Sequence, residues 1–127
     1  MTVFADTNIL ARLMTNDVPT MSAQAAQMVE ACKQREIIVL DAVLVELFFV
    51  LQTHSQYRFP KTTIVDLFQS IILPTPQFVV SPSAISALDI YKSQPKLDFM
   101  DCLLSVYAGS QKKKLLSFDQ DLLNTLK

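Results

Sequence analysis

Short apolar runs alternate along the chain with longer segments in which apolar residues recur at helical spacing. Four runs are continuous and suit strands buried on both faces, at residues 2–5, 37–40, 77–80 and 114–118. The helical patterns cover residues 8–14, 20–34, 42–55, 61–73, 82–93, 98–112 and 120–126. Strands separated by helices predict an α/β fold, with a central parallel sheet of four strands covered by helices on both faces.

Composition sets the size and surroundings expected of this fold. A chain of 127 residues with one glycine, no linker and no repeat predicts a single domain over residues 1–127. Half of its residues are hydrophobic, and that surplus favours a partner or a dimer. The longest nearly apolar run, 37–51, contains two acids and is too short to span a bilayer, and no secretory signal is present. We therefore expect a cytoplasmic protein that makes no membrane contact and keeps Cys32 and Cys102 as free thiols.

The distribution of charge limits how the protein can bind nucleic acid. A formal net charge of −1 argues against a protein that wraps nucleic acid by bulk positive charge. The one basic run, Lys112 to Lys114, sits where a predicted helix ends, and stabilisation of that helix end is its simplest interpretation. Arg12, Arg58, Lys61 and the same lysine run are candidates for phosphate contacts, although each also fits a solvated surface charge.

Four acidic side chains from distant segments are predicted to meet at one edge of the sheet. Asp6 directly follows the first strand and Asp119 the last. Glu46 lies one helical turn beyond the second strand, and Asp101 lies in the first turn of the helix before the last strand. In open α/β sheets this carboxyl edge is where ligands bind. Two charges about 5 Å apart repel by roughly 3 kcal/mol at an effective dielectric near 20, so such a cluster needs a cation, or some of its acids must stay protonated. Oxygen ligands without His or Cys favour Mg²⁺ or Mn²⁺ over Zn²⁺.

Each acid also has a purely structural interpretation. Asp6 and Asp119 can cap or stabilise the helices that follow them. Asp98 and Asp101 stand three residues apart and can form a capping box. Glu46 has the weakest structural alternative, because its neighbours along the helix are apolar and an unpaired buried carboxylate is costly.

Four segments resemble, in the same order, the acidic motifs of PIN domains: ADTNILARLMTND, VLVELFFVL, LDFMDCLLSVYA and LLSFDQDL. More narrowly, they look like the VapC toxins of bacterial and archaeal toxin–antitoxin pairs. The resemblance implies an endoribonuclease that uses Mg²⁺ or Mn²⁺ to hydrolyse RNA. It assigns the catalytic and metal-binding acids to Asp6, Glu46, Asp101 and Asp119. It assigns supporting roles to the polar residues Thr7, Asn8, Asp98 and Ser117.

The same resemblance implies partners and a possible fifth strand. The expected partners are an RNA substrate such as tRNA, a cognate antitoxin that covers the active cleft, and a second copy in a homodimer. Many members continue into a short terminal strand, whereas this chain stops at Lys127 after one brief helix. We therefore expect a sheet of four strands, or of five where a terminal strand is supplied.

Two rival functions follow from the same residues. A catalytically inactive PIN scaffold that binds proteins is the alternative, but an inactive site has no reason to keep uncompensated acids around Glu46. Phosphatase and receiver domains also place aspartates at strand ends. They fit less well, because Asn8 stands where a haloacid-type phosphatase needs its second Asp and Ser81 stands where a receiver needs its phosphoacceptor.

Overall fold

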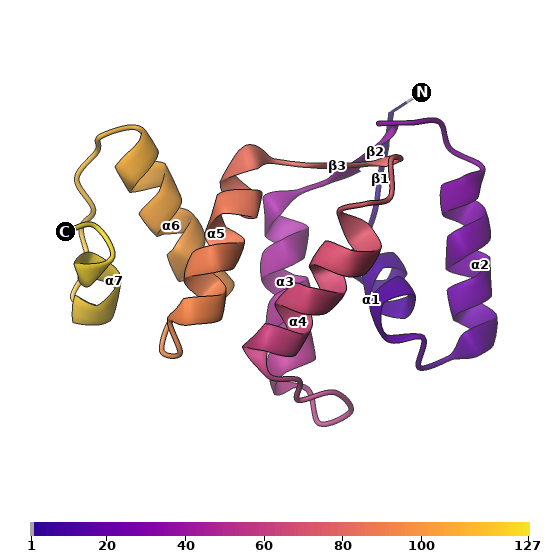
Figure 1. Cartoon of the computed structure of the whole chain (residues 1–127), viewed down its shortest axis with the longest axis horizontal. Coiled ribbons are helices and arrows are strands. Elements are labelled where there is room, and N and C mark those ends of the chain that lie inside the picture. The colour runs from indigo at the N-terminus through magenta and orange to yellow at the C-terminus, as the bar shows by residue number, and fades with distance from the viewer. Residues whose placement is uncertain (1) are drawn as a thin grey trace. The chain divides into compact units, whose positions relative to one another are not determined.

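A computed structural model describes residues 2–127 of the chain (Figure 1). The chain divides into two compact units, which we call unit 1 (Met1–Ser81) and unit 2 (Pro82–Lys127). None of the helices formed by the described residues is both long and apolar enough to cross a bilayer.

Unit 1 contains a parallel sheet and most of the helices. In chain order its elements are β1 (Val3–Phe4), α1 (Thr7–Thr15), α2 (Pro19–Glu30), β2 (Ile37–Val39), α3 (Asp41–Thr53), α4 (Lys61–Leu67), the π-helix η1 (Phe68–Ile72) and β3 (Phe78–Val80). The sheet order is β1-β2-β3, with Ile37 of β2 opposite Val3 on one side and Phe78 on the other. Both pairings are parallel. The segments that leave β1 and β2 therefore start from the same edge of the sheet.

The helices that follow β1 and β2 pack against each other. α1 contacts α2, α3 and η1, and it buries one stripe of side chains, Leu10, Ala11 and Met14. α3 buries a stripe at helical spacing, Leu44, Leu47, Phe48 and Leu51. The Phe48 ring meets the Phe68 ring of η1 edge-on, with 5.4 Å between centroids. This apolar packing holds the N-terminal ends of α1 and α3 in one neighbourhood.

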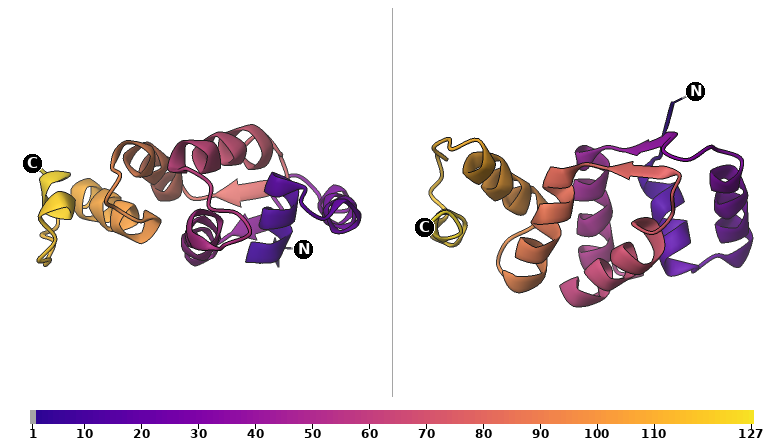
Figure 2. Two further views of the ribbon diagram at one scale, coloured as in Figure 1. Left: turned by 90° about the horizontal axis from the view of Figure 1, so that it is seen from below. Right: turned by 45° about the horizontal axis from the view of Figure 1, so that its top comes forward.

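Unit 2 consists of three helices, α5 (Pro82–Ser93), α6 (Phe99–Ser110) and α7 (Gln120–Asn124). α5 and α6 lie side by side (Figure 2), and the rings of Tyr91 and Phe99 meet edge-on at 5.7 Å between centroids. A hydrogen bond of 2.6 Å between the hydroxyl groups of Ser105 and Thr125 ties α6 to the residue that follows α7.

The α/β class, the parallel sheet and the order of strands and helices agree with the sequence prediction, but the number of strands does not. Among residues 2–127 the sheet has three strands rather than four or five. Residues 113–119 form no strand, and Leu116 and Phe118 are exposed. The prediction that the strands are buried on both faces also holds only in part, since Phe4 of β1 is 65% exposed. An apolar run records a tendency to be buried, whereas a strand also needs a hydrogen-bonded neighbour.

Candidate active site

Asp6 lies between β1 and α1 and is the N-cap of α1. Its backbone is extended (φ −93°, ψ 173°), and its Oδ1 accepts a hydrogen bond from Ile9 N at 3.0 Å. The capping interpretation of Asp6 is therefore confirmed. A cap bond occupies one carboxylate oxygen, and Asp6 is exposed. The arrangement thus holds the carboxylate in a fixed orientation and still offers Oδ2 to a ligand.

Glu46 lies in the second turn of α3, where the sequence suggested a carboxylate among apolar neighbours. It is exposed, because Leu44 and Leu47 point into the core from the opposite face of the helix. Thr7, the first residue of α1, donates a hydrogen bond from Oγ1 to Glu46 Oε2 at 3.1 Å. This bond joins residues 39 positions apart. It brings the first two acidic motifs of the sequence together within unit 1.

Asp98 and Asp101 form a reciprocal capping box at the start of α6, as their spacing predicted. Asp98 Oδ1 accepts from Asp101 N at 2.9 Å, and Asp101 Oδ2 accepts from Asp98 N at 3.2 Å. Each side chain therefore satisfies a backbone donor that the first turn of a helix would otherwise leave unpaired. The box fixes the orientation of both carboxylates and uses one oxygen of each.

Asp119 is the N-cap of α7. Its Oδ1 accepts from Leu122 N at 3.2 Å, and its own backbone N–H donates to Ser117 Oγ at 2.9 Å. Ser117 thus supports Asp119 through the backbone rather than through the carboxylate. The hydroxyl shapes the turn that presents the acid.

The acids of unit 2 repel one another electrostatically. Burial raises the pKa of Asp101, and the neighbouring charges of Asp98 and Asp119 raise it further, while the backbone hydrogen bond from Asp98 opposes them. The ionised form of Asp101 is therefore disfavoured by its surroundings. A cation bound beside it would relieve that repulsion, which is the electrostatic pattern common at functional sites.

The described residues thus present two acidic groups, one in each unit. Unit 1 supplies Asp6 and Glu46, with Thr7 between them, and Asn8 is exposed next to them. Unit 2 supplies Asp98, Asp101 and Asp119. Among residues 2–127, no three His, Cys, Asp or Glu side chains lie together in an arrangement that could hold a metal ion. The donors are all oxygens, which suits Mg²⁺ or Mn²⁺ by chemistry.

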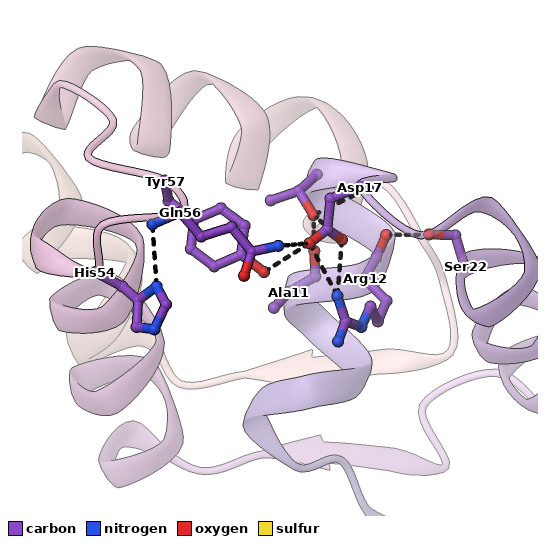
Figure 3. A network of polar contacts seen from close by, with 8 residues as sticks. Ala11, Arg12, Asp17, Ser22, His54, Gln56 and Tyr57 are labelled. Carbon is purple, nitrogen blue, oxygen red and sulfur yellow. Dashed lines mark hydrogen bonds and ion pairs between the residues drawn. The ribbon is translucent and has the colours of Figure 1, made fainter.

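Two of the candidate phosphate contacts, Arg12 and the lysine run, are placed differently from what the sequence predicted. Arg12 is not a free surface charge, since its guanidinium Nη1 donates to both carboxylate oxygens of Asp17 at 2.9 Å (Figure 3). The lysine run begins after Ser110, the last residue of α6, and so does not lie in the last turn of that helix. Local sequence patterns do not mark Asp17 as important, because its partners lie across a helix end and up to 40 positions further along the chain.

Comparison with known proteins supports one family. The sequence model of the PIN domain matches residues 3–126, which includes parts of both units and all four acidic motifs. No curated protein and no solved structure shows significant similarity to the chain. The chain therefore belongs to the PIN domain family.

Proposed function

We propose that the chain is a metal-dependent endoribonuclease. PIN domains are typically nucleases that use divalent metal ions. The observation that carries the proposal for this chain is the hydrogen bond from Thr7 to Glu46, which joins two acidic motifs that the sequence holds far apart. A purely structural pair of helices has no need of an exposed carboxylate held in this way next to a second one at Asp6.

The proposed ligands for Mg²⁺ or Mn²⁺ are Asp6, Glu46, Asp101 and Asp119. Their caps support the proposal, because each of the three aspartates uses only one oxygen in a local hydrogen bond. The second oxygen of each is then available to a cation. When bound, the cation would lower the pKa of a water molecule and stabilise the negative charge that grows on the phosphate.

The chain's own residues orient the ligands in this scheme. Thr7 fixes the rotamer of Glu46 by donating to one of its oxygens. Asp98 fixes the first turn of α6 and with it Asp101, and Ser117 shapes the turn before Asp119. Such outer partners matter because ligands held in place before substrate binds need no reorganisation during the reaction.

Hydrolysis by water predicts products with 5′-phosphate and 3′-hydroxyl ends. The other route to RNA cleavage activates the ribose 2′-hydroxyl, and it relies on side-chain acids and bases such as histidine. His54 is the single histidine of the chain, and its Nδ1 accepts a hydrogen bond from Gln56 N at the end of α3. Cleavage products with 2′,3′-cyclic phosphate ends, detected by mass spectrometry, would count against the metal route.

The biological role that we propose is that of a VapC-type toxin. Its RNA substrate, for example a tRNA, places the enzyme in the cytoplasm, where a cognate antitoxin covers the site. We further propose that the toxin acts as a homodimer. The support for this role is the resemblance of the four acidic segments, beginning with ADTNILARLMTND, together with membership of the PIN family.

The test is cleavage of labelled tRNA and structured RNA by the full chain, with Mg²⁺ or Mn²⁺ against excess EDTA. Asp6→Asn and Asp101→Asn remove one ligand from each unit, and Asp89→Asn removes an exposed acid of α5 outside the motifs. We expect metal-dependent cutting that the first two variants abolish and the third retains. If the folded wild type cuts nothing with either metal, the endoribonuclease proposal fails and a protein-binding role takes its place.

A further inference from the structure

A second polar cluster in unit 1 centres on Asp17, two residues after the end of α1. Its carboxylate accepts hydrogen bonds from four side chains (Figure 3). The donors and distances are Arg12 Nη1 to both oxygens at 2.9 Å, Thr15 Oγ1 at 2.8 Å, Gln56 Nε2 at 2.7 Å and Tyr57 Oη at 2.9 Å. Only 17% of the Asp17 side chain and 23% of the Arg12 side chain are exposed. The cluster is therefore a partly buried, charge-assisted network, with Gln56 at its exposed side.

The four donors come from α1 and from the loop that follows α3. Arg12 and Thr15 belong to α1, whereas Gln56 and Tyr57 belong to the loop after α3. That loop is tied to the end of α3, because Tyr57 N and Arg58 N both donate to His54 O and Phe59 N donates to Leu51 O. Asp17 therefore links the C-terminal end of α1 to the C-terminal end of α3.

The same two helices are linked at their other end by Thr7 and Glu46. α1 has nine residues, so the two links are separated by roughly 13 Å along the helix axis at 1.5 Å per residue. Two directional links at opposite ends determine how far α1 can slide or rotate against α3. Apolar packing brings the two helices together, but the hydrophobic effect is non-directional, so the polar links add a restriction that it does not supply.

The Asp17 link is the stronger of the two. Thr7 and Glu46 share one hydrogen bond at an exposed position, where water competes for both groups. Loss of the Asp17 carboxylate would instead leave the Tyr57 hydroxyl and the Arg12 guanidinium without their shared acceptor, and Arg12 Nε already has no hydrogen-bond partner among the described residues. Unpaired buried polar groups are costly, so the network resists distortion.

We propose that Asp17 is a positioning residue for the acidic site: by holding the far end of α1 against the loop after α3, it sets the spacing of Asp6 and Glu46. This inference rests on the proposed function, since it assigns a consequence for metal binding to a contact remote from the acids. It places Tyr57 and Gln56 in the same role, as the groups through which Asp17 reaches α3.

The test compares Asp17→Asn and Tyr57→Phe with the control Ser22→Ala. Tyr57→Phe removes one hydroxyl and keeps the ring. Ser22 is buried and donates from Oγ to Arg12 O at 2.8 Å, so the control removes a bond at the same end of α1 that leads to α2 rather than α3. Mn²⁺ binding is measured by the electron paramagnetic resonance signal of free Mn²⁺, and kcat and KM are measured on labelled RNA, all well below the unfolding temperature.

We expect both network variants to weaken Mn²⁺ binding about threefold to tenfold and to lower kcat with little change in KM. This effect is smaller than the roughly 10–100-fold loss typical of a direct outer partner of a ligand. Ser22→Ala is expected to lower the unfolding temperature and leave Mn²⁺ binding unchanged. Thr7→Val combined with Tyr57→Phe should show a non-additive effect, because both substitutions act on one helix pair.

Three outcomes would overturn the inference. Network variants that bind Mn²⁺ as the wild type does, and lose only thermal stability, would show a purely structural role. If Ser22→Ala weakens Mn²⁺ binding as much as the network variants do, the contact between Asp17 and the loop after α3 has no specific effect on the site. If the wild type does not bind Mn²⁺ and Asp6→Asn changes nothing, the proposed function fails as well. Should Asp17→Asn not fold, Tyr57→Phe decides alone.

Discussion

Thr7 Oγ1 lies 3.1 Å from Glu46 Oε2 and donates a hydrogen bond to it, so the first residue of α1 orients a carboxylate of α3. Asp6 precedes Thr7 and caps the same helix. The turn at Asp6 and Thr7 therefore positions both candidate ligands of unit 1: it carries Asp6 itself, and it orients Glu46 through the Thr7 hydroxyl group.

This relationship predicts a specific loss in Thr7→Val. Valine has nearly the shape of threonine but no hydroxyl, so Glu46 loses its donor while the helix is kept. We expect Mn²⁺ affinity to fall about 10–100-fold, as for other outer partners of metal ligands. Thr7→Ser restores the hydroxyl and should remain close to the wild type. Equal Mn²⁺ affinity in the valine and serine variants, measured by titration, would contradict a role for this bond.

Asp101→Asn is predicted to raise stability at neutral pH while it abolishes cleavage. Burial and the charges of Asp98 and Asp119 raise the pKa of Asp101, so its ionised form is less favourable in the folded state than in the unfolded state. Asparagine keeps an oxygen that can accept from Asp98 N. The folded chain then loses a repulsive charge, which is the common trade between activity and stability at functional sites.

The stability gained in Asp101→Asn should depend on pH, because the pKa of Asp101 differs between the folded and unfolded states. A carboxylate whose folded-state pKa is raised costs stability increasingly as pH rises through that pKa. The gain of Asp101→Asn should therefore be absent below the ordinary aspartate pKa of 3.8 and present at pH 7. Urea unfolding followed by circular dichroism at pH 3 and pH 7, without metal, measures it. A stability difference that is the same at both pH values would disprove the electrostatic explanation.

Asp17 has the opposite dependence on pH. Burial raises its pKa, but hydrogen bonds from Arg12, Thr15 and Tyr57 and the Arg12 charge outweigh burial and lower the pKa to about 2. Its contribution to stability is therefore full above the ordinary value of 3.8 and is lost as pH falls toward 2.

The substitution Asp17→Asn tests this sign. We expect it to cost about 1–2 kcal/mol of unfolding free energy at pH 6, less than the full pKa difference implies because the carboxylate keeps some contact with solvent. The gap between wild type and variant should narrow as pH falls from 4 to 2. Urea unfolding across that range measures the gap, and a gap that stays constant would contradict the assignment.

Lys112 adopts a left-handed backbone, with φ at 54°. A side chain is strained in this conformation, and the chain has a single glycine, Gly109, three residues earlier. Lys112→Gly should therefore stabilise the chain by about 0.5–1 kcal/mol, after allowance for the greater freedom of glycine in the unfolded state. Lys113→Gly removes the same charge one position further on, where φ is not positive, and should destabilise instead. Thermal unfolding of the two variants separates backbone strain from charge.

Much of the fold was predictable from local signals. The three strands of the sheet lie within the apolar runs, and every helix overlaps a predicted one, because hydrophobic periodicity reflects which side chains face the core. The caps at Asp6 and Asp98 were predictable for the same kind of reason, since a cap joins residues only three positions apart. The prediction failed at residues 114–118, which form no strand. Their apolar content indicates a strand, but it does not tell whether a neighbouring strand is available to pair with them.

The amino-acid sequence by itself determined the segments that form helices and strands, the capping acids and the PIN-like order of the acidic motifs, because these depend on residues within a few positions of one another. Tertiary structure alone decided that Thr7 donates to Glu46 and that Tyr57 donates to Asp17, across 39 and 40 positions of chain. It also decided that Arg12 is bound to Asp17 instead of being free for phosphate. Such pairings depend on how α1 packs against α3: the shared apolar core brings the two helices together, and the polar pairs then restrict how they sit against each other.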